Sequence, residues 1–256
     1  MPDLHVDVTD GVLRLTLDRP EHLNALTDQM TDGLSSAIED AVTRSDVRVV
    51  LLAGRGDAFC VGADIAGAEA HERFDVTALD RANRLVRAIV GLHKPVVAAV
   101  RGVAAGVGCS AALACDLVVA AESASFLLAF ARIGLMPDGG ATATVAAAIG
   151  RARALRMALL AEPLSAREAY AAGLVSHVVP DDAFATEVES VVSRLVAGPP
   201  LAYAAAKRAV NDAALAQLEQ ALDRERTGQA ILLNTHDVAE GMRAFSEKRR
   251  PEFRGE

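Results

Sequence analysis

The sequence predicts an α/β protein built from repeated ββα turns, with a helical region at its C-terminal end. Three observations support this fold class. Short runs rich in Val, Leu and Ala alternate with segments whose apolar residues have helical spacing. Two of these runs lead through glycine-rich loops into helical segments, and beyond residue 183 the spacing is helical throughout. With 256 residues, 52% of them hydrophobic, the chain can bury a substantial core.

The chain opens with a predicted hairpin. Residues 4–8 and 12–17 alternate apolar and polar side chains on either side of a Thr-Asp-Gly turn, and a loop follows at Pro20. Thr27 is the expected N-cap of a helix whose apolar positions are Met30, Leu34, Ile38 and Val42. The β-branched segment 47–54 then predicts a buried strand.

The middle of the chain continues this alternation. We expect, in order, a helix over 71–93, a strand over 95–100, a helix over 108–115, a strand over 116–121, a turn at 137–140, helices over 151–161 and from Ser165, and a strand over 175–179. A Gly-Pro-Pro break at 198–200 interrupts the helices that follow. We therefore divide the chain into a core, 1–195, and a helical region, 196–256.

Composition argues against several kinds of partner. The formal net charge of -8 does not suit a nucleic-acid-binding surface or an anionic membrane surface. The sequence has no apolar stretch of signal or membrane-spanning length. Cys60, Cys109 and Cys115 form neither a disulfide framework nor a metal-spaced cluster, so we expect small buried thiols in a cytoplasmic protein. His71 and His93 lack partners at metal-binding spacing, and we expect no metal.

The segment from Lys94 to Asp116, KPVVAAVRGVAAGVGCSAALACD, is the most informative in the chain. It indicates a strand, a glycine loop and a helix start, where backbone N–H groups near Val107 and Gly108 lack intrahelical acceptors. The spacing G-x-x-x-G-x-G matches neither the dinucleotide fingerprint nor the phosphate loop. The loop could hold an anion, or its glycines could simply let the helix pack closely on a strand.

A second loop repeats this pattern upstream. VLLAGRGDAFCVGADIAG at 51–68 indicates a buried strand, a glycine loop and a helix start near Ala63 and Asp64. Two such loops could direct one N–H each, from near Ala63 and from Val107, at a single oxygen. That would form an oxyanion hole for a thioester carbonyl that becomes an enolate.

Five segments together carry a resemblance to a known family. They are LDRPEHLNAL at 17–26, AFCVGADI at 58–65, KPVVAAVRGVAAGVGCSAALACDLVVA at 94–120, ARIGLMPDGG at 131–140 and FSEKRRPEF at 245–253. Over its whole length the chain resembles the crotonase family, also called the enoyl-CoA hydratase/isomerase family. The resemblance implies a spiral of ββα turns, a helical trimerisation region giving a homotrimer or a dimer of trimers, and an acyl-CoA thioester as substrate. It implies no cofactor beyond the coenzyme A of that substrate.

The resemblance also implies site residues. The peptide N–H groups of Ala63 and Val107 would hold the thioester oxygen. Further positions would contact the CoA thioester: Glu21, His22, Leu23, Asp64, Ile65, Ala66, Phe245 and Lys248. Several relatives carry Lys where this chain has Glu21 or Ala66, and an acid near a phosphate is unfavourable. Three arginines lie nearby in the sequence and could substitute: Arg19, Arg55 and Arg73.

The acids of this chain favour isomerisation over hydration. Family hydratases hold a water between two glutamates, but the matching positions here are Ser110 and Phe130, which are not carboxylates. Asp138 resembles the acid in the turn of the family's enoyl-CoA isomerases, where one carboxylate moves the proton. Ser110, Phe130, Leu135 and Met136 would line the acyl pocket, whose apolar character would raise the pKa of Asp138.

Three alternatives remain open at this point. Asp138 is also an ordinary residue for a Pro-Asp-Gly turn. The protein could be a hydratase with Asp138 as a non-standard acid, or a non-catalytic acyl-CoA binding protein. Of the other acids, Asp64 is expected to cap a helix start and Asp116 to order the next loop through backbone hydrogen bonds.

Overall fold

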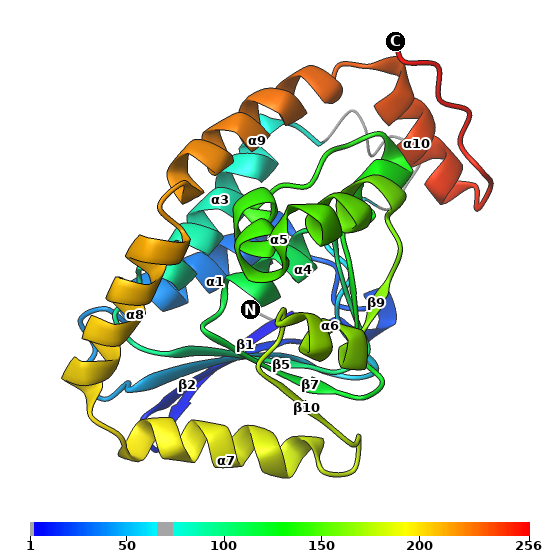
Figure 1. The fold of residues 1–256 in the computed structure, drawn as a ribbon. Helices are drawn as coiled ribbons and strands as arrows, with labels where there is room; N and C mark the ends of the chain where they lie inside the picture. The colour runs from blue at the N-terminus through cyan, green and yellow to red at the C-terminus, as the bar shows by residue number, and fades with distance from the viewer. Residues whose placement is uncertain (1–2, 66–73) are drawn as a thin grey trace.

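A computed structural model describes residues 3–65 and 74–256. Within them, the larger sheet has six strands in the order β1-β2-β3-β5-β7-β10 (Figure 1). Their bounds are Leu4–Thr9, Val12–Leu17, Val49–Gly54, Val96–Val100, Leu117–Ala121 and His177–Val179. The predicted hairpin β1–β2 is antiparallel, and every other pairing in this sheet is parallel. The predicted strands are thus confirmed, with small shifts at their ends.

A smaller sheet lies beside the first. In the described residues it has four strands, in the order β4-β6-β8-β9. Their bounds are Ala58–Cys60, Val103–Ala105, Ser125–Leu127 and Leu164–Ser165. Each turn of the chain contributes β3, β5 or β7 to the large sheet and the next strand, β4, β6 or β8, to the small one. Repetition of this step, followed by a helix, produces the expected spiral of ββα turns.

Helices surround the two sheets. The α-helices are α1 (Asp28–Asp40), α3 (Val76–Gly91), α4 (Gly106–Ala114), α5 (Ala141–Leu160), α6 (Ala166–Ala172), α7 (Phe184–Ala197), α8 (Pro200–Ala214), α9 (Leu218–Leu232) and α10 (His236–Ser246). The short 3-10 helices are η1 (Pro20–His22) and η2 (Ala129–Ile133). No helix in the described ranges combines the length and the apolar character needed to cross a bilayer.

The helix boundaries confirm some local predictions and correct others. Thr27 caps α1, because its hydroxyl accepts a hydrogen bond from the backbone N of Met30 at 3.2 Å. Val42 was expected on the apolar face of this helix, but α1 ends at Asp40 and Val42 is 47% exposed. The helix expected over 151–161 is the second half of α5, which is kinked at Gly150.

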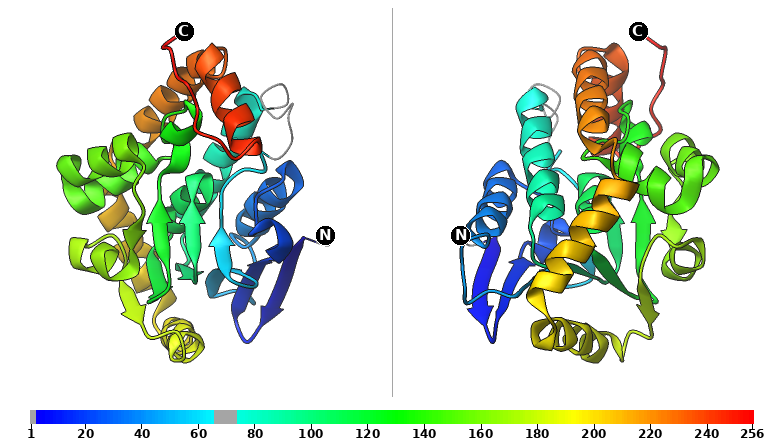
Figure 2. Two further views of the ribbon diagram at one scale, coloured as in Figure 1. Left: turned by 90° about the vertical axis from the view of Figure 1, so that its right-hand side faces the viewer. Right: turned by 60° about the vertical axis from the view of Figure 1, so that its left-hand side comes forward.

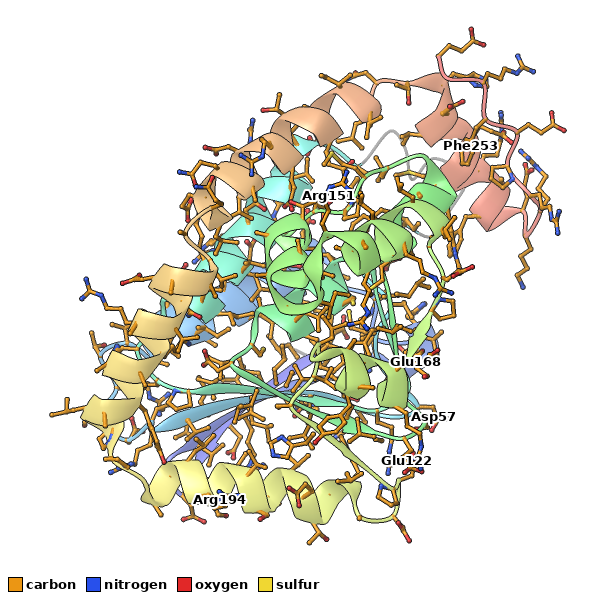
Figure 3. All side chains as sticks on the ribbon, viewed as in Figure 1. Asp57, Glu122, Arg151, Glu168, Arg194 and Phe253 are labelled. Carbon is orange, nitrogen blue, oxygen red and sulfur yellow. The ribbon has the colours of Figure 1, made fainter. Side chains whose placement is uncertain are left out.

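The C-terminal helices cover two different parts of the core. Helix α7 packs on the outer face of the large sheet, and the predicted division at residue 195 falls in its last turn. From there α8 rises along the molecule to α9 (Figure 2). Polar side chains such as Arg194 of α7 and Glu168 of α6 are exposed at the surface (Figure 3).

A buried ion pair ties α8 to the core. Lys207, whose side chain is 8% exposed, lies 2.8 Å from Asp116 and also donates to the backbone oxygen atoms of Ile89 and Lys94. Asp116 in turn accepts a hydrogen bond from the backbone N of Val96 at 2.7 Å. Asp116 was expected to order the loop that follows it, but its backbone hydrogen bond is to the start of β5, and its side chain also pairs with Lys207.

Candidate active site

The two glycine loops meet in space. A side-chain carbon added to Gly62 would lie 3.5 Å from the backbone nitrogen of Val107, and one added to Gly106 would lie 3.6 Å from the Cα of Gly62. The loop after β4 and the start of α4 are therefore in van der Waals contact. The sequence predicted two loops of the same design, and the fold places them side by side.

The N–H groups of Ala63 and Val107 are left without acceptors. Leu26 pairs with the chain around Ala63, donating to Gly62 O at 2.8 Å and accepting from Asp64 N at 2.9 Å, so the N–H of Ala63 faces away from this pairing. No acceptor for it lies among the described residues. Val107 is in the first turn of α4, where an N–H has no intrahelical acceptor. Unpaired N–H groups on two adjacent loops are one condition for an oxyanion hole, which stays a prediction.

Close packing explains one of the glycines as well. A side-chain carbon at Gly108 would lie 2.5 Å from Sγ of Cys60, so only glycine lets α4 approach β4 this closely. Cys60 and Cys109 are buried, and burial raises the pKa of each thiol to about 12. Cys115 is also buried, and burial raises its pKa too. All three are the small buried thiols expected, and none has the lowered pKa of an activated nucleophile.

Asp138 is a buried carboxyl in the turn between η2 and α5. Its exposure is 4%, and its Oδ2 accepts a hydrogen bond from Nε2 of Gln229 at 2.8 Å. Burial raises the pKa of Asp138 to about 7, the hydrogen bond from Gln229 opposes this rise, and the nearby charge of Glu225 adds to it. A carboxyl with this pKa can both accept and return a proton near neutral pH.

The turn that carries Asp138 lies against the start of α4. The hydroxyl of Ser110 donates to the backbone oxygen of Asp138 at 2.8 Å. A side-chain carbon at Gly139, whose φ is +63°, would lie 3.0 Å from Cβ of Ser110 and 3.5 Å from Cγ2 of Val107. Glycine is therefore needed here both for its conformation and for space. The fold brings Asp138 next to the first turns of the helix that presents the Val107 N–H.

The remaining candidates for the acyl pocket also lie around this turn. The backbone N of Leu135 donates to the oxygen of Phe130 at 3.1 Å, and both side chains belong to the same buried cluster as Val107. Met136 is partly exposed and has its backbone N and O bound by Gln229. The four residues lie around the same turn, and their role as an acyl pocket stays a prediction.

The candidates for contact with CoA fall into two groups. Glu21, His22 and Leu23 are exposed on and after η1, and Leu23 O accepts from the backbone N of Val61 at 3.2 Å, which places this group beside Ala63, Asp64 and Ile65. Phe245 and Lys248 are exposed at the end of α10. No hydrogen bond or ion pair between described residues joins the two groups. Ala66 lies outside the described residues.

The arginines proposed to compensate for Glu21 have other partners. Arg19 is 11% exposed, bonds the backbone of Ala25 and lies 3.1 Å from Asp64, so it is an internal support and not a free phosphate contact. Arg55 pairs with Asp18 at 2.6 Å but keeps 61% of its side chain exposed. Arg73, His71 and the residues that Asp64 was expected to cap lie outside the described residues. His93 is exposed.

Two polar residues of α9, not identified from the sequence, complete the site. Glu225 and Gln229 are 1% and 0% exposed, and they face the Asp138 turn. Glu225 accepts from the backbone N of Gly140 at 2.7 Å and of Thr142 at 2.9 Å. The sequence contains one indication of their burial. Glu225 and Gln229 are four residues apart and continue the helical spacing of the apolar residues Leu218 and Leu222. No group of three or more metal-ligating side chains occurs in the part of the chain that the structure describes.

The chain is similar to known proteins over nearly its whole length. The family model described as enoyl-CoA hydratase/isomerase matches residues 7–256. A probable enoyl-CoA hydratase of Rhodobacter capsulatus is 40% identical, covering 98% of each chain. The 1,2-epoxyphenylacetyl-CoA isomerase of Escherichia coli is 38% identical, covering 97% of each chain. The crystal structure of an enoyl-CoA hydratase from Mycobacterium avium subsp. paratuberculosis superimposes with a TM-score of 0.93 at 50% identity, covering 98% of each chain. The chain therefore belongs to the enoyl-CoA hydratase/isomerase family and has the crotonase fold.

Proposed function

We propose that this protein moves a double bond within an acyl-CoA, converting a 3-enoyl-CoA, or a related ring-opened acyl-CoA, to the 2-enoyl-CoA. The observation that carries the proposal is Asp138, a buried carboxyl with a pKa of about 7, beside the helix that presents the Val107 N–H. Membership of the family supports an acyl-CoA thioester as substrate. One similar protein is itself called an acyl-CoA isomerase.

The proposed reaction moves one proton and leaves the composition unchanged. The carboxylate of Asp138 removes a proton from C2 of the 3-enoyl thioester, and the electron pair is delocalised onto the thioester oxygen. The N–H groups of Ala63 and Val107 hold that oxygen, where one such donor contributes about 3–4 kcal/mol to the transition state. Asp138 then returns the proton at C4, which forms the double bond between C2 and C3.

Hydration has less support from the residues of this chain. At the two positions where family hydratases would carry glutamate, the Ser110 hydroxyl is bound to the backbone of Asp138 and Phe130 has no ionisable group. A hydratase that uses Asp138 alone is the second candidate, because the similar protein of Rhodobacter capsulatus is named a probable hydratase. Isomerisation needs one carboxylate that can take and return the proton. Asp138 suits this role, because the other buried carboxyl of the site, Glu225, is bound to the backbone N of Gly140 and Thr142.

We propose further that the CoA moiety lies along the group formed by the exposed residues Glu21, His22 and Leu23 and the partly buried residues Asp64 and Ile65. The Phe245 and Lys248 group would contact the CoA of a neighbouring subunit in a homotrimer or a dimer of trimers. Lys248 suits this role because it is exposed, whereas the adjacent Arg249 is held 2.5 Å from Glu240.

Product mass separates the candidate functions. The protein is incubated with a panel of 2-enoyl-CoA and 3-enoyl-CoA thioesters of different acyl groups, and products are analysed by mass spectrometry. Isomerisation of a 3-enoyl substrate leaves the mass unchanged and moves the double bond. Addition of water to a 2-enoyl substrate would favour the hydratase, and binding without turnover or proton exchange in deuterated water would favour a non-catalytic binding protein.

A further inference from the structure

We propose that Gln229 of α9 is a positioning residue that leaves one defined oxygen of Asp138, Oδ1, free to exchange the proton with the substrate. This inference rests on the proposed function and deepens it. It concerns a residue that lies 91 positions from Asp138 in the chain, in the C-terminal helical region.

Three hydrogen bonds fix the side chain of Gln229. Its Oε1 accepts from the backbone N of Met136 at 3.2 Å, and its Nε2 donates to Met136 O at 2.9 Å and to Asp138 Oδ2 at 2.8 Å. The reverse orientation of the amide would set Oε1 against two acceptors, and the backbone N of Met136 against a donor. The amide is fully buried, so water cannot replace these partners. Asp138 therefore always faces a donor at Oδ2.

This contact distinguishes the two oxygens of Asp138. Because Nε2 has no lone pair to accept a hydrogen bond, a proton on Asp138 is favoured at Oδ1. Oδ1 makes no hydrogen bond with the described residues. Of the side-chain N and O atoms that are sealed from solvent in the described structure, only Asn83 Oδ1 lacks a partner, so Oδ1 of Asp138 is not sealed. Oδ1 is thus the oxygen of Asp138 that is free to exchange a proton with the substrate.

Glu225 extends the same support to the other side of Asp138. It lies one helical turn before Gln229 and binds the backbone N of Gly140 and Thr142, while Gln229 binds Met136. One face of α9 therefore holds the chain both before and after the acid. Holding a reacting group in this way is worth up to about a hundredfold in rate for a displacement of ~1 Å.

The charged surroundings of Asp138 make the pH profile informative. From α9 the carboxyl faces the amide of Gln229 and the charge of Glu225, and the contact of this turn with α4 is made by the uncharged Ser110, which binds the backbone oxygen of Asp138. The hydrogen bond from Gln229 lowers the pKa of Asp138. Its loss is therefore expected to raise the pKa and to move the acidic limb of the kcat/KM profile to higher pH.

Gln229→Leu and Gln229→Glu are the test variants, and Gln217→Leu is the matched control, because Gln217 is exposed at the N-terminal end of the same helix. We expect a fall in kcat of about 10- to 100-fold for Gln229→Leu, with KM for the 3-enoyl-CoA changed by less than about threefold. In deuterated water, the ratio of exchange at C2 to product labelled at C4 should rise, because a poorly aimed carboxyl returns the proton to the wrong carbon more often. The control should match the parent in all three measurements.

Gln229→Glu keeps the size of the side chain and tests the inference if Gln229→Leu does not fold. A carboxyl in contact with Asp138 should raise the pH of half-maximal kcat/KM by one unit or more, since two adjacent carboxyls share a proton. Parent values of kcat, pH profile and exchange ratio in a folded variant would overturn the inference. Its failure is distinct from failure of the proposed function, which would instead appear as an active Asp138→Asn variant or as no isomerase activity in the parent.

Discussion

The hydroxyl of Ser110 donates a hydrogen bond of 2.8 Å to the backbone oxygen of Asp138. Ser110 occupies a position where family hydratases would carry an acid. In this chain its side chain instead holds the turn that contains Asp138. Ser110 is fully buried, and Gly139 packs directly against it. Ser110 thus helps to order the turn that carries Asp138, the residue that we propose as the acid.

Replacement of Ser110 by alanine should weaken this turn. We expect Ser110→Ala to lower the free energy of unfolding by about 1–3 kcal/mol, because the Asp138 carbonyl loses a buried donor. Isomerase activity should fall as well, with the parent pH profile retained. Ser123→Ala, which removes an exposed hydroxyl bound to Asp181, is the control and should change stability by less than about 0.5 kcal/mol. Equal unfolding midpoints for both variants in urea would contradict this role of Ser110.

Asp138→Asn should separate binding from chemistry. The amide keeps the size of the carboxyl and can still accept a hydrogen bond from Gln229, but it cannot take a proton from carbon. We expect isomerisation to fall at least about 100-fold. Titration calorimetry with a saturated acyl-CoA should give the parent affinity. Asp181→Asn, at an exposed site, should retain parent activity, and full activity in Asp138→Asn would refute the assignment of the base.

The raised pKa of Asp138 has a definite effect on stability. Below the usual aspartate pKa of about 4 the carboxyl is protonated in both folded and unfolded states. Between that pH and about 7, the unfolded chain has released the proton while the folded chain retains it, so stability falls as pH rises. This contribution is complete at low pH and lost above the folded pKa.

Unfolding experiments on the parent and Asp138→Asn can detect this effect. The variant cannot ionise, so its stability relative to the parent should increase from about pH 5 to about pH 7 and then level off. Glu225, whose pKa burial also raises, is present in both proteins and largely cancels in the comparison. Parallel stability curves across this range would show that Asp138 ionises normally in the folded protein.

Asn83 gives a prediction for stability alone. Its Oδ1 is sealed in the interior without a hydrogen-bond partner in the described structure, and the residue is 3% exposed. Asn83→Leu should therefore be neutral or raise the free energy of unfolding by about 1 kcal/mol, because it removes an unsatisfied polar atom at similar volume. Asn83→Asp places a charge there and should destabilise the protein at neutral pH. A loss of stability in the leucine variant would reveal a hydrogen bond to this oxygen.

Features that depend on neighbouring residues could be predicted from the sequence. The Thr27 cap, the hairpin and the two glycine loops each follow from a few consecutive residues, and each is present. Short strands were harder: β6 and β9 have 3 and 2 residues, too few to show a period of two. Val42 continued an apolar spacing past the end of α1, since the periodicity contains no stop signal there.

The support of Asp138 could not be predicted in the same way. Gln229 and Glu225 lie 91 and 85 residues from their partners Asp138 and Gly140, and polar residues on a helix ordinarily face solvent. Arg19 was predicted to be available for phosphate because it lies near the candidate ligand residues in the sequence. In the structure its guanidinium is paired with Asp64. Both cases depend on tertiary contacts between segments that are distant in the chain.

The close approach of Gly108 to Cys60 means that movement at the start of α4 can be measured by the reactivity of a natural thiol. The thiol of Cys60 is buried beneath the first turn of α4, so separation of this helix from β4 should expose it to a reagent. The rate of Cys60 alkylation can be followed by peptide mass spectrometry. It would report how often the first turn of α4, which contains Val107, separates from β4. A thioester bound at both loops should stabilise their contact and slow that alkylation, and the slowing would measure affinity without any probe attached to the protein.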